Sequence, residues 1–190
     1  MEGKRVLVIG ASSGIGAAIA KEASLDRAQV VVVARRYRKL LEEFTVNNGP
    51  LISMSAKPIE ADVTVAEDMM DMAMEANEHL GGFDLVVYCA GFARLLRLRD
   101  IDLDTMSNWQ ELYGTNVVGA NLATAAVLPY MNPDGAIAYL SSRTVDDRLA
   151  LLAPYTASKA ALDQCIRTWR VEEPDYRFIR VVMGWTAPTE

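Results

Sequence analysis

The stretch that decides the fold runs Arg5-Val6-Leu7-Val8-Ile9-Gly10-Ala11-Ser12-Ser13-Gly14-Ile15-Gly16. Its apolar start predicts a β-strand that leads directly into a glycine-rich loop, and an amphipathic helix is predicted to follow. In such a unit Gly10 supplies a tight turn, Gly14 lets the backbone approach an anion, and Gly16 permits close packing of helix on strand. The unpaired N–H groups at the start of the helix favour the same anion, so we expect a diphosphate at this loop.

The rest of the chain alternates between short runs rich in valine and isoleucine and longer helical patterns. The runs predict strands at 5–9, 29–34, 85–88, 136–140 and 178–183, with a further strand within 53–60. The helical patterns predict helices at 14–27, 37–47, 65–80, 107–131 and 154–171. This alternation predicts an α/β fold, a doubly wound parallel sheet (Rossmann fold) with helices on both faces. In that context the glycine loop favours dinucleotide binding over a simple turn.

Length and composition narrow the class of protein. A chain of 190 residues with 51% hydrophobic residues fits one domain with a sizeable core, and no repeat or linker divides residues 1–190. The net charge is −6, and the basic residues are scattered among acidic ones, so we expect no nucleic-acid partner. The apolar run at 6–9 is too short for a signal peptide or a membrane span, so we expect a protein that is not bound to a membrane.

Cysteine and histidine usage gives two further expectations. Cys89 and Cys165 are far apart in apolar surroundings, which argues against a disulfide framework and a cysteine-based zinc site. A reducing cytoplasm fits this pattern best. His79 is the only histidine, so we expect neither a histidine-dependent catalytic triad nor a metal centre with several histidines.

The end of the second predicted strand indicates which dinucleotide is bound. An acidic residue is needed there to hold the ribose hydroxyls of NAD, but the chain has Ala34-Arg35-Arg36 instead. Guanidinium groups suit a 2′-phosphate, which favours NADP(H) over NAD(H), although both arginines could simply be solvated. After the third strand, Asp62 and Val63 could close over the adenine, with Asp62 accepting from its amino group. Alternatively, Asp62 belongs to a helix cap.

A candidate acid–base pair lies in the last predicted helix. Tyr155 and Lys159 are four residues apart and therefore share one helix face. A phenol is a poor acid or base near neutral pH, and a nearby ammonium makes it useful by favouring the phenolate. The same spacing often occurs by chance on helix surfaces, so this pair alone is a weak signal. Ser142 lies one short loop upstream and could join the pair.

With these motifs in order, the chain resembles the classical short-chain dehydrogenase/reductase family over essentially its whole length. Gly10 to Gly16 matches the family's Gly-x-x-x-Gly-x-Gly, and Cys89-Ala90-Gly91 stands where the family has Asn-Ala-Gly. Asn116 matches the asparagine of the family's long central helix. The family's Asn-Ser-Tyr-Lys tetrad is completed by Ser142, Tyr155 and Lys159.

The resemblance implies an NADP(H)-dependent oxidoreductase that interconverts a carbonyl and a secondary alcohol. Tyr155 would exchange the proton with the substrate oxygen, and Ser142 would hydrogen-bond that oxygen. Lys159 would favour the Tyr155 phenolate and bind the nicotinamide ribose, and Asn116 would fix a water that relays protons from Lys159. An Asn116 that merely satisfies a helix distortion is the alternative. The resemblance also implies a homodimer or homotetramer formed through helices 107–131 and 154–171.

Three departures from the family pattern leave alternatives open. Cys89 replaces an asparagine beside the cofactor, and Val182-Met183-Gly184-Trp185 lacks the family's proline, which leaves Thr186 and Thr189 as equal candidates to contact the nicotinamide. The chain also ends at Glu190, where the family typically continues through a substrate-covering segment and a last strand. A catalytically impaired nucleotide-binding regulatory or scaffold protein is therefore a second hypothesis. An epimerase or dehydratase on a related, larger scaffold is a third.

The sequence indicates the substrate only in outline. The pocket would be lined by the loops at 92–102 and 144–154. Several leucines in these loops hint at an apolar small molecule, although they could simply pack the loops: Leu95, Leu96, Leu149, Leu151 and Leu152.

Overall fold

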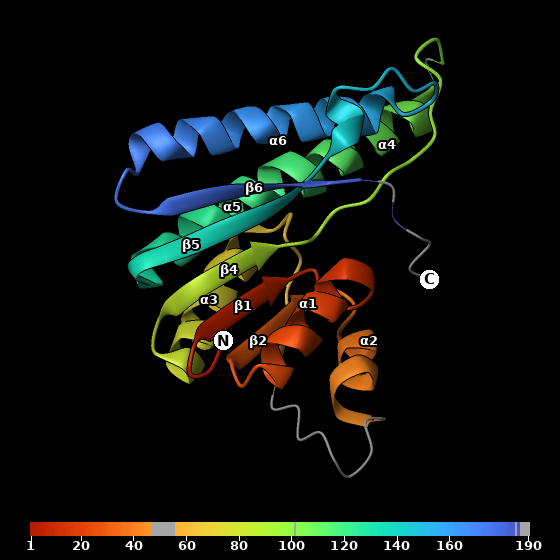
Figure 1. Cartoon of the computed structure of the whole chain (residues 1–190). Helices are drawn as coiled ribbons and strands as arrows, with labels where there is room; N and C mark the ends of the chain where they lie inside the picture. Colours follow the sequence, from red (N-terminus) through yellow and green to blue (C-terminus); the bar gives the residue numbers. More distant parts are fainter. Residues whose placement is uncertain (47–55, 101, 185, 187–190) are drawn as a thin grey trace.

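In the computed structural model, residues 1–46, 56–100, 102–184 and 186 are described, and six parallel strands form one sheet (Figure 1). The strands are β1 Arg5–Ile9, β2 Gln29–Ala34, β3 Ala56–Glu60, β4 Phe83–Tyr88, β5 Met131–Ser142 and β6 Arg177–Met183. Their order in the sheet is β3-β2-β1-β4-β5-β6. The direction of winding reverses between β1 and β4, and in sheets of this kind ligands bind in the crevice at that point.

Helices cover both faces of the sheet, as the sequence predicts. They are α1 Gly14–Leu25, α2 Tyr37–Leu41, α3 Ala66–Leu80, α4 Leu103–Tyr113, α5 Gly119–Val127 and α6 Ala153–Glu172. Two π turns, η1 Glu42–Val46 and η2 Gly114–Val118, and two 3₁₀ turns, η3 Leu128–Tyr130 and η4 Arg143–Val145, complete the described elements. The doubly wound α/β fold in a single domain is therefore confirmed. None of the helices in the described ranges has the length and apolar character needed to cross a membrane.

The sheet separates two apolar layers because strand side chains point alternately to opposite faces. In β1, Leu7 and Ile9 belong to the layer formed with α3, α5 and α6, whereas Val6 and Val8 belong to the layer formed with α1 and α2. All four side chains are 0% exposed. The continuous valine run in β2 is explained in the same way, since both of its faces are covered.

The long central helix is the main difference from the sequence prediction. A single helix was predicted over 107–131, but the structure has α4, the π turn η2 and α5 in succession, followed by η3. Strand β5 is also longer than its predicted core at 136–140, and its pairing with β4 shifts register between Phe83 and Leu85. Of the predicted ranges, Asn47 and residues 53–55 lie outside the described residues.

The π turn η2 is stabilised from the sheet. Tyr88, at the end of β4, donates a hydrogen bond of 2.7 Å to the carbonyl of Thr115 within the turn. Burial raises the pKa of the Tyr88 phenol far above its ordinary value, so the hydroxyl keeps its proton. Close packing requires glycine at position 119, because a Cβ there would lie 2.9 Å from the Tyr88 hydroxyl and from the Val63 carbonyl oxygen. The turn therefore depends on contacts from distant residues.

Candidate functional site

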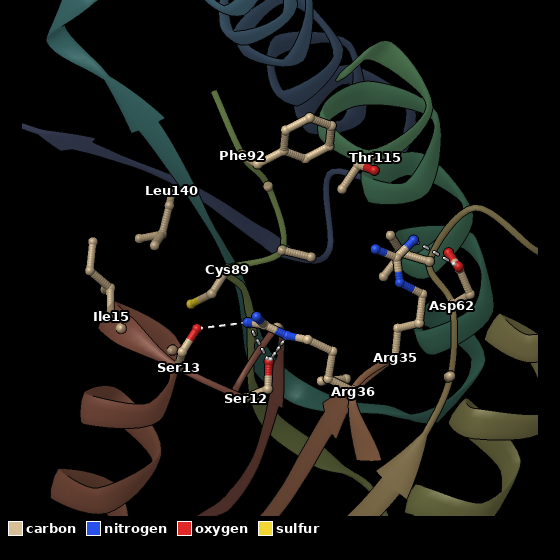
Figure 2. A pocket seen from close by; sticks show the side chains of 18 of the residues that line it. Ser12, Ser13, Ile15, Arg35, Arg36, Asp62, Cys89, Phe92, Thr115 and Leu140 are labelled. Atoms are coloured by element: carbon tan, nitrogen blue, oxygen red, sulfur yellow. Dashed lines mark hydrogen bonds and ion pairs between the residues drawn. The ribbon is translucent and has the colours of Figure 1, made fainter. Parts of the chain in front are cut away.

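A cavity of about 600 Å³ opens at the switch point of the sheet (Figure 2). Its wall contains the residues that the sequence assigned to the dinucleotide, except for the acid–base pair: Gly10, Ser12, Ser13, Gly14, Ile15, Gly16, Arg35, Arg36, Asp62, Val63, Cys89, Ala90 and Gly91. Sequence reasoning had not placed several other lining residues there: Ala34, Ala61, Phe92, Arg94, Glu111, Thr115 and Leu140. Thr186 also lines the cavity, while Thr189 lies outside the described residues.

The glycine loop is packed tightly between neighbouring strands. Gly10 has φ +92°, which an L side chain rarely adopts, and a Cβ there would lie 2.7 Å from the Cα of Ala90. The N–H groups of Gly10 and Ala11 both donate to the carbonyl of Val33 at the end of β2, at 2.7 and 3.1 Å. Contacts from β2 and from the segment after β4 thus fix the loop.

The amino terminus of α1 carries no side-chain cap. Ser13 is the N-cap residue, but its hydroxyl makes no capping hydrogen bond. Instead, it accepts a hydrogen bond of 2.9 Å from Nη2 of Arg36. The first N–H groups of the helix therefore have no side-chain acceptor from the cap residue, as an anion-binding helix start requires.

Both arginines contact other residues that line the cavity (Figure 2). Nη2 of Arg36 also donates to Oγ of Ser12, at 3.1 Å. Nη1 of Arg35 lies 3.4 Å from Oδ2 of Asp62, and the Arg35 side chain is 68% exposed. The Arg36 guanidinium therefore adds positive charge beside the glycine loop, and the Arg35 guanidinium adds it beside Asp62.

Asp62 organises the turn that precedes α3. Its Oδ1 accepts hydrogen bonds from the backbone N–H and the hydroxyl of Thr64, at 3.0 and 2.7 Å. Burial raises the pKa of Asp62, but the hydrogen bonds from Thr64 and the charge of Arg35 outweigh it and hold the pKa below its ordinary value. The N-cap residue of α3 is Val65, so the alternative in which Asp62 caps this helix is wrong. The carboxylate is engaged by Thr64 and Arg35.

Tyr155 and Lys159 lie on α6 and face each other. The ammonium nitrogen of Lys159 is 5.9 Å from the centroid of the Tyr155 ring and donates a hydrogen bond of 2.9 Å to the carbonyl of Leu140 on β5. Burial lowers the pKa of Lys159 to about 8, against smaller effects of Cys89 and Asp163 that raise it. A lysine with this pKa changes charge close to physiological pH.

Ser142 ends β5 and begins the turn η4. Its Oγ accepts hydrogen bonds from the N–H and the hydroxyl of Thr144, at 3.2 and 2.9 Å. Both bonds are accepted, which leaves the Ser142 proton available to donate to another oxygen. No hydrogen bond joins Ser142 to Tyr155 within the described ranges, although α6 packs against both β5 and η4.

Asn116 lies within the π turn η2 and is 0% exposed. Its Oδ1 accepts from the N–H of Phe92 at 3.2 Å, and its Nδ2 donates to the Phe92 carbonyl at 3.1 Å and to Oγ of Ser158 at 2.9 Å. The Ser158 hydroxyl donates in turn to the carbonyl of Tyr155, at 2.7 Å. Asn116 therefore ties the segment after β4 to the helix that carries the acid–base pair.

Gly91 leaves open the space between Asn116 and Lys159. A Cβ at Gly91 would lie 2.8 Å from Oδ1 of Asn116 and 3.3 Å from Nζ of Lys159. Nearby, burial raises the pKa of the Cys89 thiol to about 12, although the charge of Lys159 opposes this. The thiol beside the cavity is therefore protonated at neutral pH.

The loops that the sequence assigned to the substrate contact each other. The N–H of Leu96 donates to the carbonyl of Leu151, at 2.8 Å. Near Ser142, a second hollow of about 340 Å³ is lined by Arg143, Asp146, Asp147, Val182 and Gly184. In the described part of the chain, no group of three or more His, Cys, Asp or Glu side chains is arranged to hold a metal ion.

Comparisons with known proteins fit this geometry. An uncharacterized oxidoreductase of Staphylococcus epidermidis is 35% identical over 161 residues, which cover 84% of this chain and 66% of that protein. The 11-beta-hydroxysteroid dehydrogenase A of Sesamum indicum is 33% identical over 185 residues, covering 96% of this chain and 52% of that protein. The chain thus spans one half to two thirds of the length of these relatives.

Solved structures share the fold. An alcohol dehydrogenase from Thermococcus sibiricus complexed with 5-hydroxy-NADP superposes with a TM-score of 0.88 at 24% identity, covering 98% of this chain and 78% of that one. A short-chain dehydrogenase/reductase from Burkholderia phymatum in complex with NAD superposes with a TM-score of 0.85 at 19% identity. The superposition covers 99% of this chain and 67% of that one. A family model described as short chain dehydrogenase matches residues 4–190. The chain belongs to the short-chain dehydrogenase family of oxidoreductases.

Proposed function

We propose that the protein uses NADP(H) to interconvert a carbonyl and a secondary alcohol. The observation that carries this proposal is the pair of Tyr155 and Lys159 on α6. Lys159 donates a hydrogen bond to the carbonyl of Leu140 on β5, and Leu140 lines the dinucleotide cavity. A nicotinamide dinucleotide fits the wall, because Gly10 and Gly16 keep the loop close to the neighbouring backbone, with no room for a side chain, and no side chain caps the start of α1. All of residues 1–190 would serve as one cofactor-binding and catalytic domain.

The residues of the chain have separate roles in this reaction. Bound NADPH would supply a hydride to the carbonyl carbon. The Tyr155 hydroxyl gives its proton to the carbonyl oxygen, which becomes the alcohol, and Ser142 donates a hydrogen bond to the same oxygen. The Lys159 ammonium stabilises the phenolate that remains and would bind the nicotinamide ribose. Asn116 positions α6 through Ser158 and, with Gly91, borders the space where a proton-relaying water would lie.

The choice of cofactor rests on Arg35 and Arg36. Structures with this fold bind either NADP or NAD, so the fold leaves the choice to side chains at the end of β2. Arg36 donates to Ser12 and Ser13 beside the diphosphate loop, and Arg35 is exposed enough to reach a 2′-phosphate by leaving Asp62. Asp62 and Val63 would lie against the adenine.

Titration and turnover test the proposal together. Quenching of tryptophan fluorescence should give tighter binding for NADPH than for NADH, and NADPH should be oxidised with at least one member of a broad panel of ketones and aldehydes. Tyr155→Phe should remove turnover and leave NADPH binding nearly intact, because it removes only the proton donor. Undiminished turnover by this variant would exclude Tyr155 as the acid.

A nucleotide-binding regulatory or scaffold protein is the second candidate. It is favoured by Cys89, which places an uncharged thiol where the family pattern has an amide side chain. NADPH binding without oxidation of the cofactor across the whole carbonyl panel would support this candidate. Restoring the amide with Cys89→Asn would then be expected to change cofactor affinity without creating turnover.

We also propose the setting in which the protein acts. Both cysteines are free thiols, which suits a cytoplasmic protein. Helix α4 carries exposed apolar side chains at Leu103 and Met106, and the π turn η2 carries one at Val118, which suit contacts within a homodimer or homotetramer. The substrate would be a small carbonyl or alcohol, with apolar groups against the leucines of the loops at 92–102 and 144–154.

A further inference from the structure

An ion pair between a buried carboxylate and a partly exposed arginine lies between α6 and the sheet. Asp163 on α6 is only 4% exposed, and its Oδ2 lies 2.9 Å from Nε of Arg180 on β6. Among the described residues, neither carboxylate oxygen has a hydrogen-bond partner, so the contact with Arg180 is a charge pair without good hydrogen-bond geometry. Taking a carboxylate out of water is costly even when it is paired, which suggests a role for Asp163 beyond packing.

Asp163 lies one helical turn beyond Lys159. Residues four apart on a helix share a face, and both side chains are buried, Lys159 with 6% exposure. Charges in such surroundings interact more strongly than at the surface, because water screens them less. The carboxylate can therefore act on the ammonium without a direct contact.

Other groups around Lys159 do not supply the same charge. In the described part of the chain, the titratable groups beside Lys159 are Cys89 after β4 and Tyr155 and Asp163 on α6, and Arg180 on β6 pairs with Asp163. Strand β5 contributes the Leu140 carbonyl, which is a dipole. The Cys89 thiol has its pKa raised by burial to about 12, so it is uncharged where Lys159 titrates. Among these groups, Asp163 is the carboxylate.

We propose that Asp163, oriented by Arg180, is a positioning residue that keeps Lys159 in its ammonium form at neutral pH. Its consequence for catalysis rests on the proposed function, since an ammonium at Lys159 is what stabilises the Tyr155 phenolate. Its consequence for the charge of Lys159 does not depend on any reaction.

The pair predicts shifts of opposite sign for its two members. Asp163→Asn removes the anion and leaves the Arg180 cation, so Lys159 should lose its proton at lower pH, by roughly one pH unit. Arg180→Gln leaves the carboxylate uncompensated, so Lys159 should keep its proton to higher pH. General damage to packing would not produce shifts in opposite directions.

The test is a direct titration of Lys159 in the full chain. Protein labelled with ¹³C-lysine is followed by NMR across pH without cofactor or substrate, and Lys159→Arg identifies the Lys159 signal. Glu172→Gln, the same charge change at an exposed position on α6, is the matched control and should leave the midpoint unchanged. Asp163→Glu keeps the charge and should keep the wild-type midpoint.

The outcomes separate this inference from the proposed function. A lower midpoint in Asp163→Asn supports the inference even if the protein reduces no carbonyl. An unchanged midpoint in Asp163→Asn overturns it even if the enzyme is active. Should Asp163→Asn fail to fold, Arg180→Gln decides, because an unchanged or lowered midpoint there would overturn the proposal. In an active enzyme, the alkaline fall of kcat/KM should move with the midpoint.

Discussion

The two halves of the site are built in different ways. The cofactor half, formed by β1, α1 and β2, is shaped by backbone: Gly10 has a positive φ and packs on Ala90, and loop N–H groups bond to Val33. The catalytic half, formed by β5 and α6, is shaped by single side chains such as Lys159 and Asn116, which hold hydrogen bonds and charge in buried surroundings. The first half should therefore be sensitive to added atoms, and the second to lost polar groups.

The largest expected effect is an added methyl group in the cofactor half. Gly10→Ala should lower the free energy of unfolding by more than about 4 kcal/mol, because a positive φ and a backbone overlap act together. Gly3→Ala is the matched control, since Gly3 has φ +71° but nothing within 4 Å of an added Cβ. Its cost should be only about 1–2 kcal/mol. Urea unfolding measures both, and equal costs would show that packing on Ala90 is unimportant.

In the catalytic half, the loss of a buried hydrogen-bond donor should lower the free energy of unfolding. Asn116→Asp keeps the shape but has no N–H group for the Phe92 carbonyl or Ser158, and it buries a charge. We expect a loss of about 3 kcal/mol in the free energy of unfolding, together with reduced turnover. Asn121→Asp, on a less buried part of the same helical segment, provides the comparison in the same urea experiment. A smaller loss at Asn116 than at Asn121 would argue against the side-chain account.

The positive charge of Arg35 and Arg36 on the cavity wall should affect the affinity for NADPH but not for NADH. Arg36→Ala and Arg35→Ala should each weaken NADPH binding by roughly tenfold or more, because a guanidinium–phosphate contact is lost. NADH binding should change little. Arg38→Ala, an exposed arginine in α2, serves as the control for general loss of positive charge. Fluorescence titration would contradict the cofactor assignment if NADH and NADPH were weakened equally.

The pH dependence of activity and stability should diverge in the catalytic half. Because burial lowers the pKa of Lys159 to about 8 from 10.5, the unfolded chain binds more protons than the folded one between these values. The contribution of Lys159 to stability therefore rises as pH increases from about 8 to 10.5, while kcat/KM for reduction should fall through the same range. The difference between wild type and Lys159→Met in pH-dependent unfolding isolates this group. A parallel fall of both quantities would contradict the assignment.

The smallest effect is expected at the link between the two halves. Tyr88→Phe removes the hydroxyl that donates to Thr115 and should cost about 1–2 kcal/mol of stability. Cofactor affinity should stay nearly unchanged, because Tyr88 does not line the cavity. Tyr130→Phe, a partly buried tyrosine beside the same core, is the control for loss of a phenol. Calorimetry and NADPH titration check both expectations.

The sequence predicted most of the fold, because strands buried on both faces give unmistakable valine-rich runs. It also grouped the residues of the cavity wall, since loop and strand-end motifs determine where the backbone goes. It could not predict the π turn η2, because the hydrophobic spacing through Gly114–Val118 is compatible with one continuous helix. The partners of Arg36 and Asn116 were missed because Ser12, Ser13 and Ser158 become neighbours only through tertiary packing. The sequence also gave no sign that the backbone carbonyl of Leu140 accepts a hydrogen bond from Lys159, because every residue type has a backbone carbonyl.

The π turn has a consequence for how this helix can change over evolution. An α-helix advances by about 100° per residue, so one inserted or deleted residue rotates everything beyond it by that amount. Here the wide turn takes up such a step, so that Leu112 before it and Ala120 and Ala123 after it all face the core. Deleting one residue from Gly114–Val118 would therefore convert the π turn into a regular helical turn and leave both halves of the helix facing the core. This segment is where the long helix can lose a residue without turning its second half away from the sheet.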